Sequence, residues 1–429
     1  MESIILEDNP HWLNTKIYNK FEKREVLQKA VSLLATKEIL ALVGARRVGK
    51  STIAKLLINE LLKDVDAKNI FFINLEKPDF IPYKNDASYL NRVYDEYLKL
   101  ANPNIDEKIY FFIDEIQTFQ NWEVFVKSKY ENSNIKFIIT GSNSSLLTSN
   151  YSTVLTGRVF KILVHSFNFL EFLDYKNIPH KTTLEQLSNK IDISRAKDEY
   201  LKWGGYYSVI STSDERIKKE YLKNIAEDII LKDIVPRYKI KNSSSINDLF
   251  FYVVSNATTA LNYSTLSKKL GIDSKMIKEY IAYFEDNFLV STISAYHNKL
   301  TQQIKSTKKI YINDNGFLNL GINRSENSGN RLENMVFTIL NQQDKEITYM
   351  KDNYEIDFYV NSKYLYQVSY DISDEKTKSR ELNAFKHFNS NHKKKNTLIT
   401  YDTNESDEEI AIISLEKFIF ENGRYDESK

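Results

Sequence analysis

The sequence predicts an α/β protein with three parts: a parallel β-sheet wrapped by helices, a mainly helical middle and a mixed α/β end. Three observations lead to this expectation. Five nearly continuous apolar, β-rich runs occupy the first part, as expected for strands that are covered on both faces. Helix-length segments separate these runs, which is typical of a parallel sheet with helical crossovers. From residue 166 onward the apolar pattern becomes mainly helical, and strand-like runs return toward the end.

The expected elements follow from local apolar runs and the breaks between them. Strands are expected at residues 38–44, 69–75, 109–114, 135–141 and 159–164, with helices at 51–63 and 89–100. Further helices are expected at 167–175, 195–201 and 215–232, before a helix–turn–helix pattern over 263–289. Breaks rich in Ser and Asn at 241–245 and 323–330 are candidate linkers. The expected domains are therefore 1–165, 166–245, 246–322 and 323–429.

Composition excludes several classes of function. The 429 residues carry 59 Lys and Arg against 58 Asp and Glu, and a net charge of +1 argues against a surface that coats polyanions. The absence of cysteine excludes disulfides, thiolate zinc sites and iron–sulfur clusters, and the six histidines include no H-x-x-x-H pair. The sequence contains no run of about 18 apolar residues and no signal-peptide pattern at its N-terminus. We therefore expect a cytoplasmic chain without a membrane span.

Residues 44–51 read G-A-R-R-V-G-K-S and match the pattern G-x-x-x-x-G-K-[ST] in full. The match follows an expected strand and opens an expected helix, so backbone N–H groups and a helix N-terminus would surround a phosphate. Lys50 would bridge the β- and γ-phosphates, and the Ser51 hydroxyl would be a magnesium ligand. Arg46 and Arg47 would either touch phosphate or pair with carboxylates or a partner subunit. The expected nucleotide-binding residues are Gly44, Ala45, Arg46, Arg47, Val48, Gly49, Lys50, Ser51 and Thr52.

Two carboxylates, Asp114 and Glu115, stand at the end of the apolar run that begins at Ile109. Because the strands of a parallel sheet end at the same edge, these side chains should lie beside the phosphate loop. Asp114 would hold Mg²⁺ through water, and Glu115 would polarise the attacking water for hydrolysis. A further expected strand lies between the loop and this pair, and this spacing favours ATP hydrolysis over GTP hydrolysis.

Polar residues also lie around the last two expected strands of the first part. Ser142 and Asn143 would either orient the attacking water or simply form a turn. Arg158, just before the fifth strand, has three interpretations: a sensor within its own chain, an arginine finger that reaches a neighbouring copy, or a strand-edge side chain paired with a carboxylate.

Together the segments GARRVGKST, FFIDEIQ, ITGSNSSLL, LTGR and SFNFLEFL resemble the prokaryotic, mainly archaeal, AAA-type P-loop ATPases with a C-terminal domain of uncharacterised function. That family is related to the STAND-like signal-transduction NTPases. Residues 203–206 (WGGY) and 229–234 (IILKDI) extend the resemblance over nearly the whole chain. The resemblance implies ATP binding with slow hydrolysis in residues 1–165 and a helical lid in 166–245. It also implies a winged helix in 246–322 and a restriction-endonuclease-like domain in 323–429.

Within the expected winged helix, one short helix ends at Gly271 and a second begins at Ser274. Ser274, Lys275 and Lys278 fall opposite the apolar positions of that second helix, where a recognition helix would meet DNA. Residues 305, 308 and 309 are lysines that could form a basic wing. The alternative is a module that packs against protein, with these lysines as a solvated face.

The last expected domain contains most of a nuclease-like site, since restriction-type cleavage needs a helix acid, a strand acid and a Glu/Gln-x-Lys on the next strand. Glu333 lies in a helical run, Asp357 lies in a strand-like run, and a hairpin is expected around residues 361–363. Gln367 follows on the next strand, but Ser369 stands where lysine is required. A hydroxyl cannot stabilise the transition state as an ammonium does, so we expect an inactive site unless Lys376 or Lys378 substitutes.

The function expected from these features is Mg²⁺-dependent ATP binding and hydrolysis that drives a conformational switch, coupled to DNA through the winged helix. One alternative is an ATP-regulated DNA- or protein-binding regulator with little turnover, and another is an ATP-regulated nuclease. ATP and ADP are the expected ligands. The sequence leaves open whether further partners are DNA, copies of the same chain or another protein.

Overall fold

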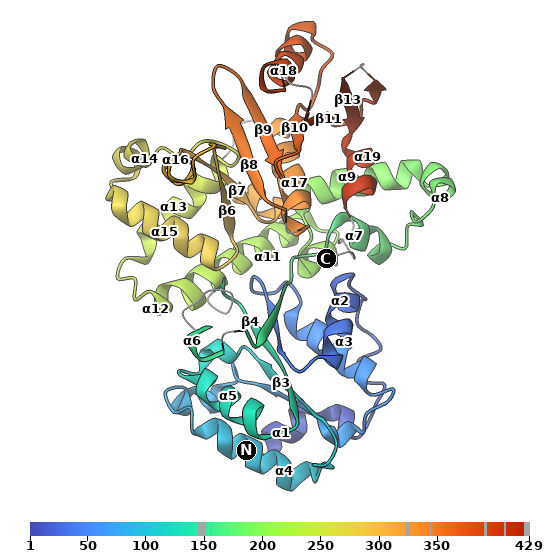
Figure 1. Cartoon of the computed structure of the whole chain (residues 1–429), viewed down its shortest axis with the longest axis vertical. Coiled ribbons are helices and arrows are strands. Elements are labelled where there is room, and N and C mark those ends of the chain that lie inside the picture. The colour runs from blue at the N-terminus through green and yellow to red at the C-terminus, as the bar shows by residue number, and fades with distance from the viewer. Residues whose placement is uncertain are drawn as a thin grey trace. The chain divides into compact units, whose positions relative to one another are not determined.

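A computed structural model describes residues 1–144, 152–155, 157–322, 327–343, 345–389, 393–406 and 409–423. The chain forms two compact units, Met1–His165 and Ser166–Lys429, shown from blue to green and from green to red in Figure 1. Part of the expected linker at 323–330 lies outside the described residues. In the part of the chain that the structure describes, no helix is both long and apolar enough to cross a membrane.

The first unit alternates strands with helices, as its apolar runs predict. Its strands are β1 (Ile39–Val43), β2 (Ile70–Asn74), β3 (Ile109–Asp114), β4 (Ile135–Gly141) and β5 (Val159–Leu163). Its α-helices are α1 (Glu2–Asp8), α2 (Val26–Ser32), α3 (Lys50–Leu61), α4 (Tyr89–Ala101), α5 (Trp122–Asn132) and α6 (Ser152–Leu155). Short 3-10 turns lie at Pro10–Trp12, Leu33–Ala35, Ala67–Asn69, Pro78–Tyr83 and η5 (Ile116–Thr118).

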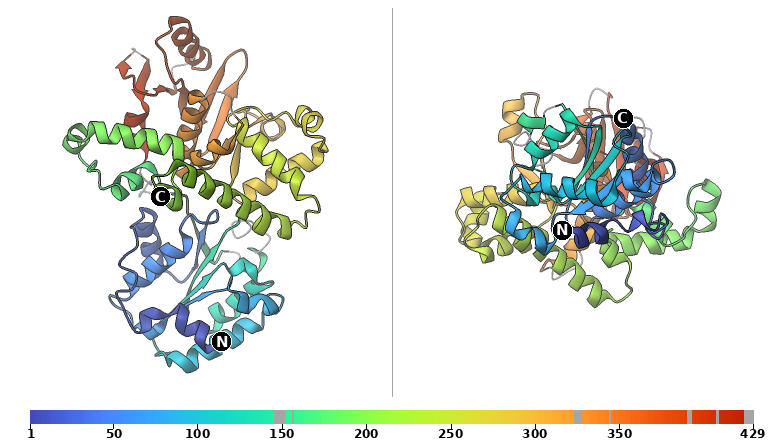
Figure 2. Two further views of the ribbon diagram at one scale, coloured as in Figure 1. Left: turned by 180° about the vertical axis from the view of Figure 1, so that it is seen from behind. Right: turned by 90° about the horizontal axis from the view of Figure 1, so that it is seen from below.

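Within the described residues, the strands of the first unit form one parallel five-stranded sheet in the order β2-β3-β4-β1-β5. Helix α3 lies on one side of this sheet, and α4 and α5 lie on the other (Figures 1 and 2). Every residue of β1 and β4 is buried, whereas the edge strand β5 is partly exposed. The predicted parallel α/β fold of this part is therefore confirmed, and all carboxyl ends of its strands lie at one edge.

The second unit begins with helices, as predicted. They are α7 (Phe169–Tyr175), α8 (Thr183–Ser188), α9 (Lys190–Trp203), α10 (Tyr207–Ile210), α11 (Glu215–Asp228), the π-helix η7 (Ile229–Ile234) and α12 (Val235–Arg237). Next come α13 (Ser243–Ser255), α14 (Tyr263–Leu270), α15 (Ser274–Asp286), β6 (Val290–Ser294), α16 (Leu300–Lys305), β7 (Lys308–Ile312) and the 3-10 turn η8 (Asn315–Leu320). Strands β6 and β7 form an antiparallel pair.

The rest of the second unit is a mixed sheet with helices on its faces. Its elements are α17 (Ser328–Gln342), β8 (Ile347–Lys351), β9 (Glu355–Val360), β10 (Tyr364–Val368), α18 (Glu375–Phe388), β11 (Lys395–Thr400), β12 (Glu405–Ser406), β13 (Ile410–Ser414) and α19 (Leu415–Asn422). Over the described residues the strand order is β12-β13-β11-β10-β9-β8. The predicted hairpin is present between β9 and β10, where Asn361 and Ser362 have φ of 49° and 53°. Two successive positive φ values are typical of a tight hairpin turn.

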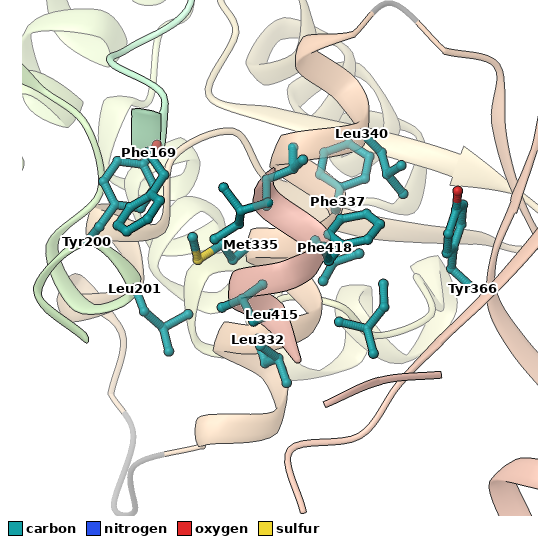
Figure 3. Close-up of a cluster of buried hydrophobic side chains, with 14 of the residues drawn as sticks. Phe169, Tyr200, Leu201, Leu332, Met335, Phe337, Leu340, Tyr366, Leu415 and Phe418 are labelled. Carbon is teal, nitrogen blue, oxygen red and sulfur yellow. The ribbon is translucent and has the colours of Figure 1, made fainter. Parts of the chain in front are cut away.

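One buried cluster joins the helical part of the second unit to its mixed sheet (Figure 3). Phe169 and Tyr200 pack edge to face, with ring centroids 5.6 Å apart, and α17 places Met335 in the same cluster. Neighbouring residues of the sheet alternate between this cluster and a second one under α18, because side chains of a strand point alternately to its two faces. The core of the second unit therefore draws on residues from all three predicted segments, and the boundaries at 245 and 322 stay predictions.

The Trp203-Gly204-Gly205-Tyr206 segment turns around a buried carboxylate. Asp314 accepts hydrogen bonds from Ser166 Oγ at 2.6 Å, from the Gly205 N–H at 2.9 Å and from the Gly316 N–H at 2.8 Å. Gly204 has φ of 69°, and a Cβ there would lie 1.8 Å from Asp314 Oδ1. Only glycine allows both this backbone conformation and this approach.

The segment Ile229–Ile234 is a π-helix between α11 and α12. Ile229, Ile230 and Ile234 are buried, and the chain then continues directly into α12. Just beyond α12, the Tyr238 hydroxyl donates a hydrogen bond to Asp286 Oδ2 at 2.8 Å, and its ring stacks on Tyr283 with centroids 3.7 Å apart. The sequence predicted a helix here but not its wider turn.

Candidate active site

The G-x-x-x-x-G-K-S segment lies between the end of β1 and the start of α3, as predicted. Gly49 precedes the helix with φ of 101°, and its carbonyl accepts the first helical hydrogen bond from the Ile53 N–H at 2.9 Å. Backbone with this φ strongly favours glycine, which accounts for the residue type at this position. The N–H groups that open α3 have no earlier turn to donate to, so they are available to an anion.

Ser51 and Asp114 lie side by side at the carboxyl edge of the sheet. The Ser51 hydroxyl lies 2.8 Å from each carboxylate oxygen of Asp114, and Thr140 Oγ1 donates to Asp114 Oδ1 at 2.7 Å. Burial first, and then the neighbouring Glu115, raise the pKa of Asp114 to about 6. A hydroxyl and a carboxylate are the hard oxygen ligands that Mg²⁺ prefers, so the residues present fit this ion.

Lys50 and Glu115 face one another in the same place. Lys50 is buried, its Nζ donates to the Ala45 carbonyl at 2.9 Å, and it lies 3.5 Å from Glu115 Oε1. Burial alone would raise the pKa of Glu115, but Lys50 and a hydrogen bond from Gln117 outweigh it and hold the pKa below its ordinary value. Glu115 is therefore an ionised carboxylate, as a proton acceptor must be before it acts.

Two side chains that sequence reasoning did not select complete this arrangement. Thr140 Oγ1 accepts a hydrogen bond from the Glu115 N–H at 3.0 Å in addition to its bond with Asp114. Gln117 Nε2 lies 2.5 Å from Glu115 Oε2 and 3.1 Å from Ser142 Oγ. Both residues belong to the segments ITGSNSSLL and FFIDEIQ, which carry the family resemblance, but their residue types alone do not indicate these contacts.

Arginines surround the loop in different ways. Arg46 forms an ion pair with Glu76 at 2.6 Å, as expected if it pairs with a carboxylate. Contact of Arg46 with phosphate stays a prediction. Arg24 is buried and donates to the Val48 carbonyl at 3.0 Å and to the His165 carbonyl at 2.9 Å. Arg24 therefore joins the phosphate loop to the last residue of the first unit.

Ser142 and Asn143 directly follow β4 and are both buried at this edge, whereas Arg158 lies elsewhere. Arg158 precedes β5, its carbonyl accepts from the Ile39 N–H at the start of β1, and its guanidinium pairs with Glu131 at 3.1 Å. Arg158 therefore lies at the edge of the sheet where the strands begin. A five-residue strand spans about 16 Å, which separates this edge from the phosphate loop. The pair with Glu131 matches the third of the three alternatives, and a position at the opposite edge of the sheet disfavours a sensor within the same chain, while the arginine finger stays a prediction. Residues 145–147 and Thr156 of the quoted motifs lie outside the described residues.

In the second unit, the predicted nuclease-like residues gather around a lysine. Lys309 Nζ on β7 lies 2.6 Å from Glu355 Oε1, 3.1 Å from Asp357 Oδ1 and 3.4 Å from Glu333 Oε1. We call these four residues the lysine cluster. Lys309 is buried, so its expected place on a basic wing is wrong. Burial alone would lower the pKa of Lys309, but the three carboxylates outweigh it and hold the pKa above its ordinary value.

Neither Gln367 nor Ser369 completes a metal site. Gln367 Oε1 accepts from the Asp357 N–H at 3.0 Å and its Nε2 donates to Glu381 at 2.8 Å, while Ser369 bonds to the Asp371 carbonyl at 3.1 Å. The ammonium of Lys309 occupies the centre of the carboxylates, so these residues do not fit a divalent cation. Among the residues that the structure describes, no group of three or more His, Asp or Glu side chains is arranged to hold a metal ion.

The predicted helix–turn–helix pattern is present as α14 and α15. Asp273 caps α15 by accepting a hydrogen bond from the Lys275 N–H at 2.8 Å. Ile277 is buried, and Lys275 and Lys278 are exposed on the other side of the helix, with Ser274 half-buried beside them. The three predicted contact residues therefore share a solvent-facing side, and their contact with DNA stays a prediction.

Comparisons with known proteins assign the first part of the chain to a known type of domain. Residues 36–173 match the family model described as an AAA domain, and residues 194–328 match a domain of unknown function. The chain is 31% identical over 414 residues to the uncharacterised protein MJ1544 of Methanocaldococcus jannaschii, covering 93% of this chain and 90% of that protein. It is 30% identical over 383 residues to an uncharacterised protein of Haemophilus influenzae, and the match covers 87% of this chain and 92% of that protein. Among solved structures, the Walker-type ATPase PABY2304 of Pyrococcus abyssi is 14% identical to this chain. The match covers 70% of this chain and 96% of that chain, with a TM-score of 0.38.

A parallel sheet with a phosphate loop after β1 and an acid pair at the end of β3 defines a P-loop protein of the AAA class. The chain belongs to the same family as the uncharacterised protein MJ1544 of Methanocaldococcus jannaschii, and its residues 36–173 are an AAA domain. The expected resemblance to AAA-type proteins is thus confirmed. The winged helix and the restriction-endonuclease-like domain stay predictions.

Proposed function

We propose that the first unit binds ATP together with Mg²⁺ and hydrolyses the anhydride bond between its β- and γ-phosphates, which releases inorganic phosphate. The observation that carries this proposal is the meeting of four groups at one sheet edge: the Lys50 ammonium, the Ser51 hydroxyl and the carboxylates of Asp114 and Glu115. A phosphate loop alone supports binding. An ionised carboxylate next to the loop lysine adds a proton acceptor for water.

Ser51 and Asp114 would hold the magnesium ion, which when bound supplies positive charge that neutralises the phosphate oxygens. Lys50 now donates to the Ala45 carbonyl and pairs with Glu115. A bound phosphate would compete for this ammonium, and the Glu115 carboxylate would then be available to orient water and accept its proton. The backbone N–H groups at the start of α3 would bind phosphate oxygen.

Two substitutions test this proposal, each with a matched control. Lys50→Ala should abolish ATP binding in the presence of Mg²⁺, whereas Lys63→Ala, at an exposed lysine beyond the same helix, should leave it unchanged. Glu115→Gln should keep ATP affinity and stop phosphate release, whereas Glu107→Gln, in an exposed loop before β3, should not. Normal phosphate release by Glu115→Gln would show that this residue is not the proton acceptor.

We further propose that ATP turnover changes the conformation of the point where the chain enters the second unit. Arg24 supports this, because it binds the Val48 carbonyl in the loop and the His165 carbonyl at the end of the first unit. Movement of the loop around a nucleotide would reach the His165 carbonyl through this guanidinium. Hydrogen exchange around residues 163–170 should differ between ATP and ADP in the wild type, and Arg24→Met should remove the difference.

A second candidate function is DNA binding by α15, which the solvent-facing Lys275 and Lys278 favour. Duplex DNA should then raise steady-state phosphate release, and the double substitution Lys275→Glu with Lys278→Glu should abolish that effect without changing basal turnover. No effect of DNA would instead favour a protein partner. A nucleotide-dependent Tm without turnover would favour the regulator with little hydrolysis.

Oligomerisation is the remaining part of the proposal. Arg158 cannot reach the loop of its own chain, so an arginine finger from this residue requires a second copy. Mass measurement in the presence of ATP and Mg²⁺, with Arg158→Ala as the comparison, tests this. A monomeric protein with full turnover would exclude the finger.

A further inference from the structure

Gln117 connects the proposed proton acceptor to the end of the neighbouring strand. It lies in η5, directly after β3, and its Nε2 donates to Glu115 Oε2 at 2.5 Å and to Ser142 Oγ at 3.1 Å. One amide group therefore binds the carboxylate at the end of β3 and the hydroxyl at the end of β4. Among the described residues, its Oε1 is buried without a hydrogen-bond partner, so the amide is oriented by its two donor bonds.

The backbone of Glu115 is already fixed by other contacts. Its φ is 54°, in the left-handed region that non-glycine residues rarely adopt, and its N–H is bound by Thr140 Oγ1. Only the side-chain torsions of Glu115 can then change its carboxylate position. Among the described residues, that carboxylate lies 3.5 Å from Lys50 through Oε1 and 2.5 Å from Gln117 through Oε2, and the charge of Arg46 also attracts it.

The two partners differ in what a nucleotide would do to them. Lys50 belongs to the phosphate loop and would be drawn to a phosphate, whereas Gln117 belongs to η5 and has no such competitor. A hydrogen bond to a charged carboxylate is among the stronger ones, so Gln117 would keep one oxygen of Glu115 in place while the other becomes available. The same amide would pass any movement of Ser142 to Glu115.

We propose that Gln117 is the positioning residue for Glu115 and that Ser142 acts on hydrolysis through Gln117. The inference rests on the proposed ATP hydrolysis and adds a residue to it. Both donor hydrogens of Gln117 are committed to Glu115 and Ser142, so its amide nitrogen has none left to donate to a substrate.

The test is Gln117→Met, which keeps the length of the side chain and removes both donor hydrogens. It should lower kcat by about 10- to 100-fold, the usual effect of losing one hydrogen bond to a charged group, with KM for ATP unchanged. Gln120→Met, the same change at an exposed glutamine three positions later, should leave both constants unchanged. A Gln117→Met enzyme with normal kcat would overturn the inference.

Two combinations check that Gln117 acts through its neighbours. In a Glu115→Gln background, Gln117→Met should have no further effect on the residual rate. Ser142→Ala and Gln117→Met should lower kcat together by no more than the larger single effect. If the two substitutions lowered kcat independently, so that their fold-changes multiplied, Ser142 would not act through Gln117.

A crystal structure of nucleotide-free Gln117→Met separates this inference from the proposed function. The Glu115 carboxylate should move away from its position beside residue 117, and an unmoved carboxylate would overturn the inference even if turnover falls. If the wild type shows no phosphate release at all, the proposed function fails, and the crystal structure alone then decides the role of Gln117.

Discussion

Replacing Lys309 tests the energetics of the lysine cluster. Its ammonium lies within 3.4 Å of three carboxylates, so Lys309→Met leaves Glu333, Glu355 and Asp357 together without their common partner. Removing one member of a buried ion pair costs about 3–5 kcal/mol, because the remaining charge stays buried. For a unit of this size each kcal/mol corresponds to about 2 °C in Tm, so we expect a fall of about 6–10 °C.

Differential scanning calorimetry of the full chain measures this effect, and hydrogen exchange at β7 and β9 assigns it to the second unit. Lys305→Met is the matched control, since this lysine of α16 is exposed and should shift Tm by less than about 1 °C. Adding Asp357→Asn to Lys309→Met should recover part of the loss by removing a buried carboxylate charge, whereas Glu355 keeps an ion pair with Lys351 at 2.7 Å. A Tm for Lys309→Met within about 2 °C of the wild type would refute the reasoning.

Three further outcomes follow from buried polar contacts. Burial raises the pKa of Glu333 from 4.5 to about 8, so between these pH values the native state holds a proton that the unfolded chain releases. The free energy of unfolding should therefore fall as pH rises from about 5 to 8. Urea titrations at several pH values should show that this free energy depends less on pH in Glu333→Gln than in the wild type. Thr140→Val removes the bonds to Asp114 and to the Glu115 N–H and should lower thermal stability by about 1–3 kcal/mol, while Thr140→Ser should behave like the wild type in the same melting experiment. Gly204→Ala places a Cβ 1.8 Å from Asp314 Oδ1 at a φ of 69°, and circular dichroism should show a loss of cooperative unfolding in the second unit; a normal transition would contradict the need for glycine there.

The five strands of the first unit could be predicted because each is a local apolar run, and its burial on both faces is visible in the run itself. The phosphate loop was equally accessible, since its function depends on residue types at fixed spacing. The expected strand at 38–44 differs from β1 (Ile39–Val43) by one residue at each end, where the chain enters and leaves the sheet. The position of Asp114 beside Ser51 followed from the shared edge of parallel strands.

The lysine cluster could not be predicted from local patterns in the sequence. Lys309 precedes Asp357 by 48 positions, and only the packing of β7 near β9 brings its ammonium to that carboxylate. The position of Arg158 at the edge away from the phosphate loop does follow from the sequence, because a residue just before a parallel strand lies at the edge where the strands begin. Gln117 was overlooked because its role depends on the distance between two strand ends, which no local pattern contains.

The π-helix at Ile229–Ile234 determines how the side chains that follow it are oriented around the helix axis. An α-helix advances by 100° per residue, so one additional residue in a wider turn rotates all later side chains by about that angle relative to an unbroken helix. That offset lets three isoleucines stay inside while Tyr238, beyond α12, reaches Tyr283 and Asp286 on α15. Shortening this segment by a single position would turn the tyrosine ring about a quarter of the way around the helix axis and detach α15 from it.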